Sequence, residues 1–291
     1  MNKIVCGDCL QVMAGMPGQS VDLVFGSPPY EDARTYGIDF KLKGQDWVDW
    51  MVEVYKESLR VCQGLVAFVV AGRTRKFAWS CTPALLIADL HRAGIAVRNS
   101  PLYVRDGIPG SGGPDWLKSK YEFIVCATNG GRLPWSDNTV MGHPPKCGPG
   151  GPLSRRKANG ARVNSEPVYA RNRRPDGTME KRAYKPPKIA NPGNIIDCRP
   201  GGGGHLGSKL AHENEAPFPE KLAEFFVRSF CPPGGTVLDP FGGSGTTMAS
   251  AEKHGRDSIS IDIRDSQVEL MHRRIGEVKG IKPMPAFMKR R

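Results

Sequence analysis

The stretch TVLDPFGGSGTTMASAEKHGRDSISIDI, residues 236–263, constrains the fold more than any other part of this chain. Its first residues are apolar, as in a short buried strand that Asp239 closes, and the glycines after it indicate a tight loop. A helix is predicted next, ending at Gly255, and then a strand, SISIDI, which ends in Asp262. A strand, a glycine-rich loop, a helix and a second strand ending in an acid predict a nucleoside-binding βαβ unit.

The spacing inside this loop restricts the class of ligand. The loop reads GGSGTT, so it contains neither the GxGxxG pattern of dinucleotide sites nor the GK[ST] pattern of a phosphate loop. Glycines allow the backbone to approach a ligand closely, and Asp262 can accept hydrogen bonds from ribose hydroxyls. We expect the loop hydroxyls to cap the helix that follows; they belong to Ser244, Thr246 and Thr247.

Residues 1–130 indicate alternating strands and helices. Predicted strands are short, rich in β-branched or aromatic residues and bounded by Gly, Pro or Asn; they are VDLVFG (21–26), GLVAFVVAG (64–72), AVRNSPLYVR (96–105) and YEFIVCAT (121–128). Predicted helices in this part lie in DWVDWMVEVYKESLRVC (46–62) and from Thr82 to His91. A further helix is predicted later in the chain, in FPEKLAEFFVRSF (218–230). Near-continuous apolar strands separated by helices favour a parallel sheet covered on both faces.

The segment FGSPPY, residues 25–30, follows directly after one of these apolar strands. Its two consecutive prolines remove two backbone donors and fix two φ angles, and they push Ser27 towards an extended conformation. The sequence therefore predicts a stiff turn that holds carbonyl groups, one hydroxyl and one aromatic ring in fixed directions. An ordinary strand-ending turn is the alternative reading of a Pro-Pro pair alone.

Residues 131–210 differ in composition from the rest of the chain. They contain 24 Gly or Pro, 15 Lys or Arg and 5 Asp or Glu, and thus hold +10 of the net charge of +12. A spacer of this length inside an α/β domain is unusual without a function. We therefore predict a basic, partly mobile insert that contacts nucleic acid, although a disordered linker has the same composition.

The remaining composition indicates a soluble intracellular protein. The longest apolar run, residues 65–71, is too short to cross a bilayer, and Asp8 interrupts the only apolar stretch near the start. The eight cysteines are scattered, and only Cys6 and Cys9 have a spacing typical of a metal site, with no second pair to complete it. We expect reduced thiols and no metal, with Cys62 and Cys126 as small core residues.

Two motifs together resemble those of the amino-group DNA methyltransferases, which use S-adenosylmethionine (AdoMet). The first is SPPY (27–30) and the second is DPFGGSGTT (239–247); GDCLQVMAGMPGQSVDLVFGSPPY and HENEAPFPEKLAEFF also look like this family. The first motif precedes the second with a basic segment between them, which is the circularly permuted order of the β class. The resemblance implies a Rossmann-like, doubly wound, mostly parallel α/β sheet. It divides the chain into a catalytic half (1–130), a target-recognition insert (131–210) and an AdoMet-binding half (211–291).

The resemblance assigns base-side roles to Ser27, Pro28, Pro29 and Tyr30. The target base flips out of the duplex, Ser27 and the carbonyl of Pro28 accept hydrogen bonds from its amine, and Tyr30 stacks on its ring. Transfer to nitrogen is direct and depends on holding two reactants in line, so no covalent nucleophile is expected. Serine at position 27 favours the N4 amine of cytosine, and the N6 amine of adenine is the alternative.

The resemblance also assigns the cofactor side of the site. Asp262 is expected on the ribose hydroxyls and Asp8 near the adenine amine, unless Asp8 merely ends a strand. The loop that cradles the methionine part comprises Asp239, Pro240, Phe241, Gly242, Gly243, Ser244, Gly245, Thr246 and Thr247. Phe218 and Pro219 match a segment that lines the cofactor pocket, unless Phe218 is a core residue.

Three other functions are compatible with parts of the sequence. An inactive nucleic-acid-binding protein would not need both motifs intact. Methylation of RNA or of protein glutamine usually accompanies NPPY, and a nicotinamide oxidoreductase would leave SPPY without a role. We expect DNA as the partner, contacted mainly through residues 131–210, no membrane, and a cytoplasmic location; a homodimer and a cognate restriction nuclease are further candidate partners.

Overall fold

The computed structural model describes residues 1–31, 40–105, 112–145, 155–156, 159, 161–163, 169–173, 178–183, 188–198 and 206–281. The chain divides into two compact units. The first combines Met1–Val140 with Gly193–Arg291, and the second is Met141–Pro192. Within the described residues, none of the helices combines the length and the apolar character that a membrane span requires.

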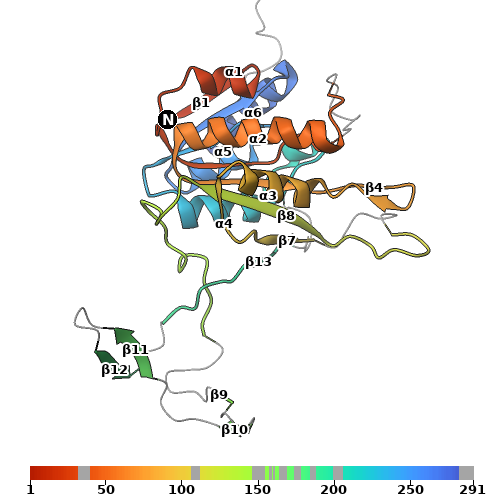
Figure 1. The fold of residues 1–291 in the computed structure, drawn as a ribbon. Helices are drawn as coiled ribbons and strands as arrows, with labels where there is room; N and C mark the ends of the chain where they lie inside the picture. Colours follow the sequence, from red (N-terminus) through yellow and green to blue (C-terminus); the bar gives the residue numbers. More distant parts are fainter. Residues whose placement is uncertain are drawn as a thin grey trace, which may run out of the picture. The chain divides into compact units, whose positions relative to one another are not determined.

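The first unit is built on a nine-stranded sheet (Figure 1). From one edge to the other its strands are β1 (Asn2–Cys6), β15 (Asp257–Asp262), β14 (Thr236–Asp239), β2 (Val21–Gly26), β3 (Cys62–Val70), β8 (Tyr121–Thr128), β7 (Leu102–Val104) and β13 (Ile195–Asp197). The ninth strand, β6 (Ala96–Val97), also pairs with β8. The pairs from β1 to β3 are parallel, β8 is antiparallel to its neighbours, and β13 is parallel to β7. The expected mostly parallel sheet is confirmed.

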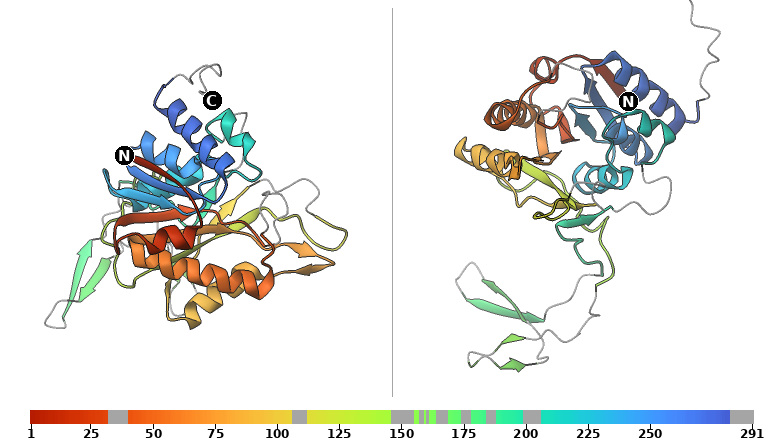
Figure 2. Two further views of the ribbon diagram at one scale, coloured as in Figure 1. Left: turned by 90° about the horizontal axis from the view of Figure 1, so that it is seen from above. Right: turned by 90° about the vertical axis from the view of Figure 1, so that its right-hand side faces the viewer.

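Helices cover both faces of the sheet (Figure 2). On one face lie α1 (Cys9–Ala14), α2 (Gly44–Val61) and α3 (Thr82–Arg92). The other face carries α4 (Glu220–Phe230), α5 (Thr246–Lys253) and α6 (Asp265–Val278), with a short 3-10 helix, η1 (Lys209–Glu213), before them. Strand β3 is buried along its whole length except at Gln63, which is why its sequence is nearly continuous in apolar residues.

The chain changes direction between β14 and β2, and this point positions the site. After β14 the chain passes through α5 to β15, whereas after β2 it passes through α2 to β3, on the other side of the sheet. Loops that leave neighbouring parallel strands in opposite directions open a crevice at the carboxyl ends of those strands. The glycine-rich loop follows β14 and the SPPY segment follows β2, so both motifs meet at this crevice.

Two local predictions need correction. The segment 96–105 forms two short strands, β6 and β7, rather than one, because Pro101 lies between them and lacks an amide hydrogen. The hydroxyls of Ser244, Thr246 and Thr247 do not cap α5: its N-cap is Gly245, at φ +72°, with no side-chain cap hydrogen bond. The edge strand β13 (Ile195–Asp197) was not predicted, and a strand before Asp8 was only an alternative reading, because short edge strands have little apolar periodicity.

The predicted core cysteines are confirmed. Cys62 and Cys126 are 0% and 3% exposed, and burial raises the pKa of both thiols to about 12. Their neighbours in the core include Tyr55, which is fully buried and donates a hydrogen bond to the carbonyl of Val125 at 2.8 Å.

Among its described residues, the second unit has two small antiparallel strand pairs. One pairs β9 (Arg155–Arg156) with β10 (Arg162–Val163), and the other pairs β11 (Tyr169–Arg173) with β12 (Met179–Ala183). This unit, Met141–Pro192, spans fewer residues than the predicted insert of 131–210. Its flanks belong to the first unit, since β13 joins the main sheet and the amide of Asp137 donates to the carbonyl of Ser229 at 2.8 Å. Whether the insert contacts DNA stays a prediction.

Candidate active site

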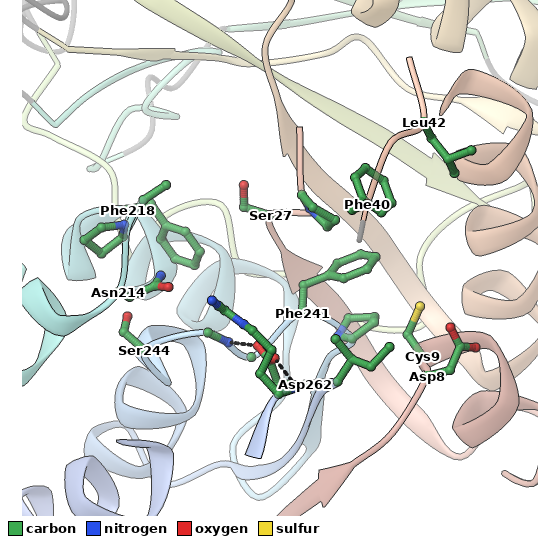
Figure 3. Close-up of a pocket in the computed structure, with 18 of the residues that line it drawn as sticks. Asp8, Cys9, Ser27, Phe40, Leu42, Asn214, Phe218, Phe241, Ser244 and Asp262 are labelled. Carbon is green, nitrogen blue, oxygen red and sulfur yellow. Dashed lines mark hydrogen bonds and ion pairs between the residues drawn. The ribbon is translucent and has the colours of Figure 1, made fainter. Parts of the chain in front are cut away.

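A cavity of about 620 Å³ lies at the carboxyl ends of β14 and β2 (Figure 3). Most of the residues predicted for the site line it: Asp8, Ser27, Pro29, Phe218, Pro240, Phe241, Gly242, Gly243, Ser244, Thr246 and Asp262. The other predicted residues do not line it: Pro28, Tyr30, Pro219, Asp239, Gly245 and Thr247. The two motifs, which lie near opposite ends of the sequence, therefore share one cavity.

The glycine-rich loop needs glycine for two different reasons. A Cβ on Gly242 would lie 2.5 Å from the sulfur of Met271, so this position allows α6 to approach the loop. Gly243 and Gly245 have φ values of +48° and +72°, which residues with a side chain rarely adopt. The amide of Gly242 donates to the carbonyl of Ile261 at 2.7 Å and ties the loop to the end of β15.

Asp262 lines the cavity and is held in a fixed orientation by its hydrogen bonds. One carboxylate oxygen accepts from the amide of Gly243 at 2.9 Å, and the other from the amide of Arg264 at 3.0 Å. The side chain of Arg264 also forms an ion pair with Asp262 at 3.5 Å and with Glu215 at 3.1 Å. A carboxylate has about four acceptor sites, so Asp262 keeps acceptors for the hydroxyls of a ligand.

Asp239 supports the loop from behind and does not line the cavity. It is 2% exposed, and its carboxylate accepts from the amide of Phe241 at 3.0 Å. Burial raises the pKa of this carboxyl to about 7. A Cβ on Gly26 would lie 2.3 Å from its Oδ1, so glycine at the end of β2 makes room for Asp239 at the end of β14.

Asp8 does not end a strand, because β1 already ends at Cys6. It is the N-cap of α1, where its Oδ1 accepts from the amide of Gln11 at 3.0 Å, and it also lines the cavity. The amide of Gly7, the residue before Asp8, donates to the carbonyl of Asp262 at 3.0 Å. This bond joins the ends of β1 and β15 and brings the two acids, Asp8 and Asp262, to the same cavity.

Aromatic side chains form the wall nearest α2, and two of them, Phe40 and Trp50, were not predicted as site residues. Phe40 contacts Trp50 edge-on with 5.2 Å between ring centroids, and Trp50 contacts Phe241 at 5.8 Å. Leu42 lies beside them, and Figure 3 shows Phe40 and Phe241 on neighbouring parts of the wall. Trp50 lies in the predicted helix 46–62, whose apolar spacing indicates burial against the sheet and gives no sign of a ligand.

The SPPY segment is fixed by hydrogen bonds to three distant parts of the chain. The hydroxyl of Ser27 donates to the carbonyl of Val69 at 3.2 Å, and the indole of Trp47 donates to the carbonyl of Pro29 at 2.9 Å. The phenol of Tyr30 donates to Glu122 at 2.7 Å. Ser27 thus has its acceptor lone pairs left for a ligand, whereas the carbonyl of Pro29 already accepts one hydrogen bond.

Glu31, which follows the motif, anchors it to the surrounding elements. Although 5% exposed, it accepts from the amide of Gly44 at 3.2 Å and from the hydroxyl of Thr82 at 3.3 Å, and its carbonyl accepts from Arg73 at 3.3 Å. Sequence reasoning missed Glu31, Trp47 and Glu122, because the spacing of a motif gives no information on partners that lie elsewhere in the chain.

Comparison with known proteins supports the same family as the two motifs. The type II methyltransferase M.PvuII of Proteus hauseri is 26% identical over 290 residues, which cover 90% of this chain and 80% of that protein. The DNA adenine methyltransferase YhdJ of Escherichia coli (strain K12) is 24% identical, with 94% of this chain and 82% of that protein covered.

Solved structures share the fold. The PvuII DNA methyltransferase (cytosine-N4-specific) matches with a TM-score of 0.66 and 20% identity, over 96% of this chain and 90% of that one. The TTHA0409 protein of Thermus thermophilus, complexed with S-adenosyl-L-methionine, matches with a TM-score of 0.58 and 21% identity, over 96% of both chains. The sequence profile of the DNA methylase family, which comprises N6 and N4 methyltransferases, matches residues 21–273. This chain belongs to the DNA methylase family.

Proposed function

We propose that this protein transfers a methyl group from AdoMet to the exocyclic N4 amine of cytosine in DNA. One observation supports this more than any other: Ser27 of the SPPY motif and Asp262 of the nucleoside-binding unit line the same cavity. A cavity of about 620 Å³ lies within the range of small-molecule sites, which is about 300–1,000 Å³.

The residues of the cavity fit AdoMet. Asp262, oriented by two backbone amides, accepts from the ribose hydroxyls, and the flat apolar wall of Phe40, Trp50 and Phe241 suits the adenine ring. Asp8 has acceptor capacity beyond its cap bond and suits the adenine amine. When bound, AdoMet supplies an electrophilic methyl group on a sulfonium.

The SPPY segment fits an exocyclic amine. Because the hydroxyl hydrogen of Ser27 is donated to the carbonyl of Val69, the oxygen of Ser27 presents lone pairs to the amine. The resemblance assigns the second acceptor to the carbonyl of Pro28, next to Ser27, and the carbonyl of Pro29 already accepts one hydrogen bond from Trp47. Two acceptors take both amine hydrogens and leave the nitrogen lone pair directed at the methyl group, in line for displacement. With AdoMet held by Asp262 and the glycine-rich loop, its methyl group would pass to the amine that Ser27 and Pro28 hold, leaving a thioether, and the amine proton would pass to water.

Cytosine is favoured over adenine by the serine at position 27 and by the fold shared with a cytosine-N4-specific enzyme. Adenine N6 is the second candidate, because YhdJ, which is similar to this chain over most of its length, is a DNA adenine methyltransferase. Base flipping brings either amine to the cavity. We further expect the reaction in the cytoplasm, with a cognate nuclease or a second copy of the chain as candidate partners.

Nucleoside mass spectrometry tests the proposal. DNA from cells that express the wild-type protein is digested and compared with DNA from cells that express Ser27→Ala. We expect 4-methylcytosine only with the wild type. A product of 6-methyladenine would select the second candidate, and no product from a folded protein that binds AdoMet would contradict both.

A further inference from the structure

Exposed apolar side chains gather around a hairpin beside the active site. The hairpin pairs β4 (Thr74–Arg75) with β5 (Ala78–Trp79). Phe77 is 73% exposed and Trp79 43%, and in the segment leading into β8 Leu117 is 94% and Tyr121 46% exposed. Clustered exposure of large apolar side chains, rather than single ones, indicates an interaction surface. We name residues 73–79 together with 116–123 the aromatic–basic surface.

The rings of this surface pack in a defined arrangement. Phe77 meets Trp116 edge-on with 5.4 Å between centroids, and Trp79 stacks on Phe123 at 6.5 Å. Two glycines make room for the indoles. A Cβ on Gly72 would lie 2.4 Å from Nε1 of Trp79, and one on Gly113 would lie 2.3 Å from the ring of Trp116. Trp79 therefore packs closely on the backbone at Gly72, and Trp116 packs closely on the backbone at Gly113.

The turn of the hairpin has an unfavourable sequence for its geometry. Lys76 and Phe77 form a two-residue loop with φ values of +46° and +65°. Such turns favour Asn-Gly, since side chains such as those of lysine and phenylalanine are strained at positive φ. Strained residues at the tip of an exposed hairpin are typical of a functional contact.

The charges on this surface suit a polyanion. Arg73, Arg75 and Lys76 lie in the hairpin, and Lys118 and Lys120 in the segment before β8. All five residues are exposed. Within the hairpin, residues 73–79, the sequence has no acidic residue. Cations interleaved with exposed rings are the combination that binds phosphates and unstacked bases.

The aromatic–basic surface lies next to the SPPY motif. The hairpin follows β3 at its carboxyl end, the end at which β2 passes into Ser27–Tyr30, and Val70 of β3 pairs with Phe123 of β8. Arg73 donates to the carbonyl of Glu31, the residue after Tyr30, at 3.3 Å. Figures 1 and 2 show the β4–β5 hairpin and the segment before β8 projecting together from this side of the sheet.

We propose that the aromatic–basic surface is a second DNA contact, separate from the basic insert, which holds the duplex beside the flipped nucleotide. Arg75 and Lys76 bind phosphates, and Phe77 contacts the bases next to the vacated position. The proposal rests on the proposed function, in which DNA is the substrate. It adds a DNA contact outside the SPPY and DPFGGSGTT motifs.

The charge contribution is tested with Arg75→Ala/Lys76→Ala. Affinity for a fluorescently labelled DNA duplex is measured between about 50 and 200 mM salt. Loss of two phosphate contacts should reduce the slope of the logarithm of DNA affinity against the logarithm of salt concentration by about 1.8 in magnitude. The matched control is Lys3→Ala/Lys56→Ala, which removes the same charge from β1 and α2 and should leave the slope near that of the wild type. Equal slopes for both double variants would overturn the proposal.

The turn is tested with Lys76→Asn/Phe77→Gly, which gives the hairpin its preferred sequence. If the hairpin were only structural, this variant would be at least as stable as the wild type and bind DNA equally well. We expect an unchanged or raised melting temperature, unchanged AdoMet affinity and DNA affinity lowered about tenfold. Wild-type DNA affinity in this variant would overturn the proposal.

These outcomes separate this inference from the proposed function. Failure of the proposed function shows in the wild-type protein, as absence of any methylated nucleoside. Failure of the present inference shows as wild-type DNA affinity in the hairpin variants while the wild type still methylates DNA.

Discussion

The phenol of Tyr30 donates a 2.7 Å hydrogen bond to a carboxylate oxygen of Glu122, a residue 92 positions further along the chain. The other oxygen of Glu122 binds the guanidinium of Arg105 at 2.7 Å, and the carboxylate is 5% exposed. Because Arg105 fixes the buried carboxylate of Glu122, its hydrogen bond with Tyr30 fixes the direction of the tyrosine ring. The ring that we expect to contact the flipped base is therefore positioned by β8, which carries Glu122, and by Arg105 directly after β7.

Removing Glu122 should impair methyl transfer through Tyr30. We expect Glu122→Ala to lower kcat about five- to thirtyfold, which corresponds to about 1–2 kcal/mol for a lost buried hydrogen bond, with AdoMet affinity unchanged. In the Tyr30→Phe background, Glu122→Ala should lower kcat by a clearly smaller factor, because the hydrogen bond between the two side chains is already absent. Additive effects in this double-mutant cycle would mean that Glu122 acts independently of Tyr30. Glu224→Ala, in an i,i+4 pair on α4, is the matched control.

Ser27 and Tyr30 should have distinguishable defects. Ser27→Ala removes one acceptor for the amine, so the single-turnover rate should fall about five- to 150-fold, equivalent to about 1–3 kcal/mol. Tyr30→Ala should lose most of the transfer and recover part of it on DNA with mismatched targets, where less unpairing energy is needed. Both should retain AdoMet affinity, as measured by calorimetry. Wild-type transfer by Tyr30→Ala on matched duplex would show that the ring does not contact the base.

Asp262→Ala should weaken AdoMet binding and leave DNA affinity nearly unchanged. Loss of a ribose acceptor at a largely buried site corresponds to about 1–3 kcal/mol. Asp265→Ala, at the start of α6 and outside the cavity wall, is the control. Calorimetry that gives the same AdoMet affinity for Asp262→Ala and the wild type would remove this acid from the site.

The basic insert is expected to bind phosphates through its arginine-rich stretch. Neutralising Arg155, Arg156 and Lys157 should lower DNA affinity and reduce the log–log salt slope by about 0.9 for each phosphate that is no longer bound. Titrations of labelled duplex at several salt concentrations measure this slope. An unchanged slope would place recognition elsewhere, and comparison with the hairpin variants would show how the two surfaces share the duplex.

Stability should fall as the pH rises towards neutrality because of Asp239. Burial raises the pKa of this carboxyl to about 7, above the value of about 3.9 for an unfolded aspartate, so the native state binds the extra proton between these values. The free energy of unfolding therefore decreases with rising pH in this window and levels off above it. Relative to Asp239→Asn, the wild type should lose up to about 3 kcal/mol between about pH 5 and 8. Urea titrations of both proteins, with Asp49→Asn as a control, measure this difference; a difference that is constant with pH would contradict it.

The sequence predicts the parts of the site that depend on local chemistry. The glycine-rich loop and the strand ending at Asp262 follow from φ preferences and apolar patterning within a single βαβ unit, and the structure brings both to the cavity. Partners such as Trp47, Glu31 and Glu122 depend on how strands pair, which no local pattern encodes. The antiparallel course of β8 is a further example, since its buried, mostly apolar sequence resembles that of β2 and β3, which run parallel to each other.

The contact between Gly26 and Asp239 has a consequence for how the enzyme is put together. These residues end neighbouring strands, yet the chain passes through the whole insert between them. A cut within Met141–Pro192 would therefore leave one fragment with SPPY and another with Asp262, each holding only one wall of the cavity. Methyl transfer would then require the two fragments to reassociate along three strand pairs, β2 with β14, β1 with β15 and β7 with β13, so that completing the sheet would control the activity of a split enzyme.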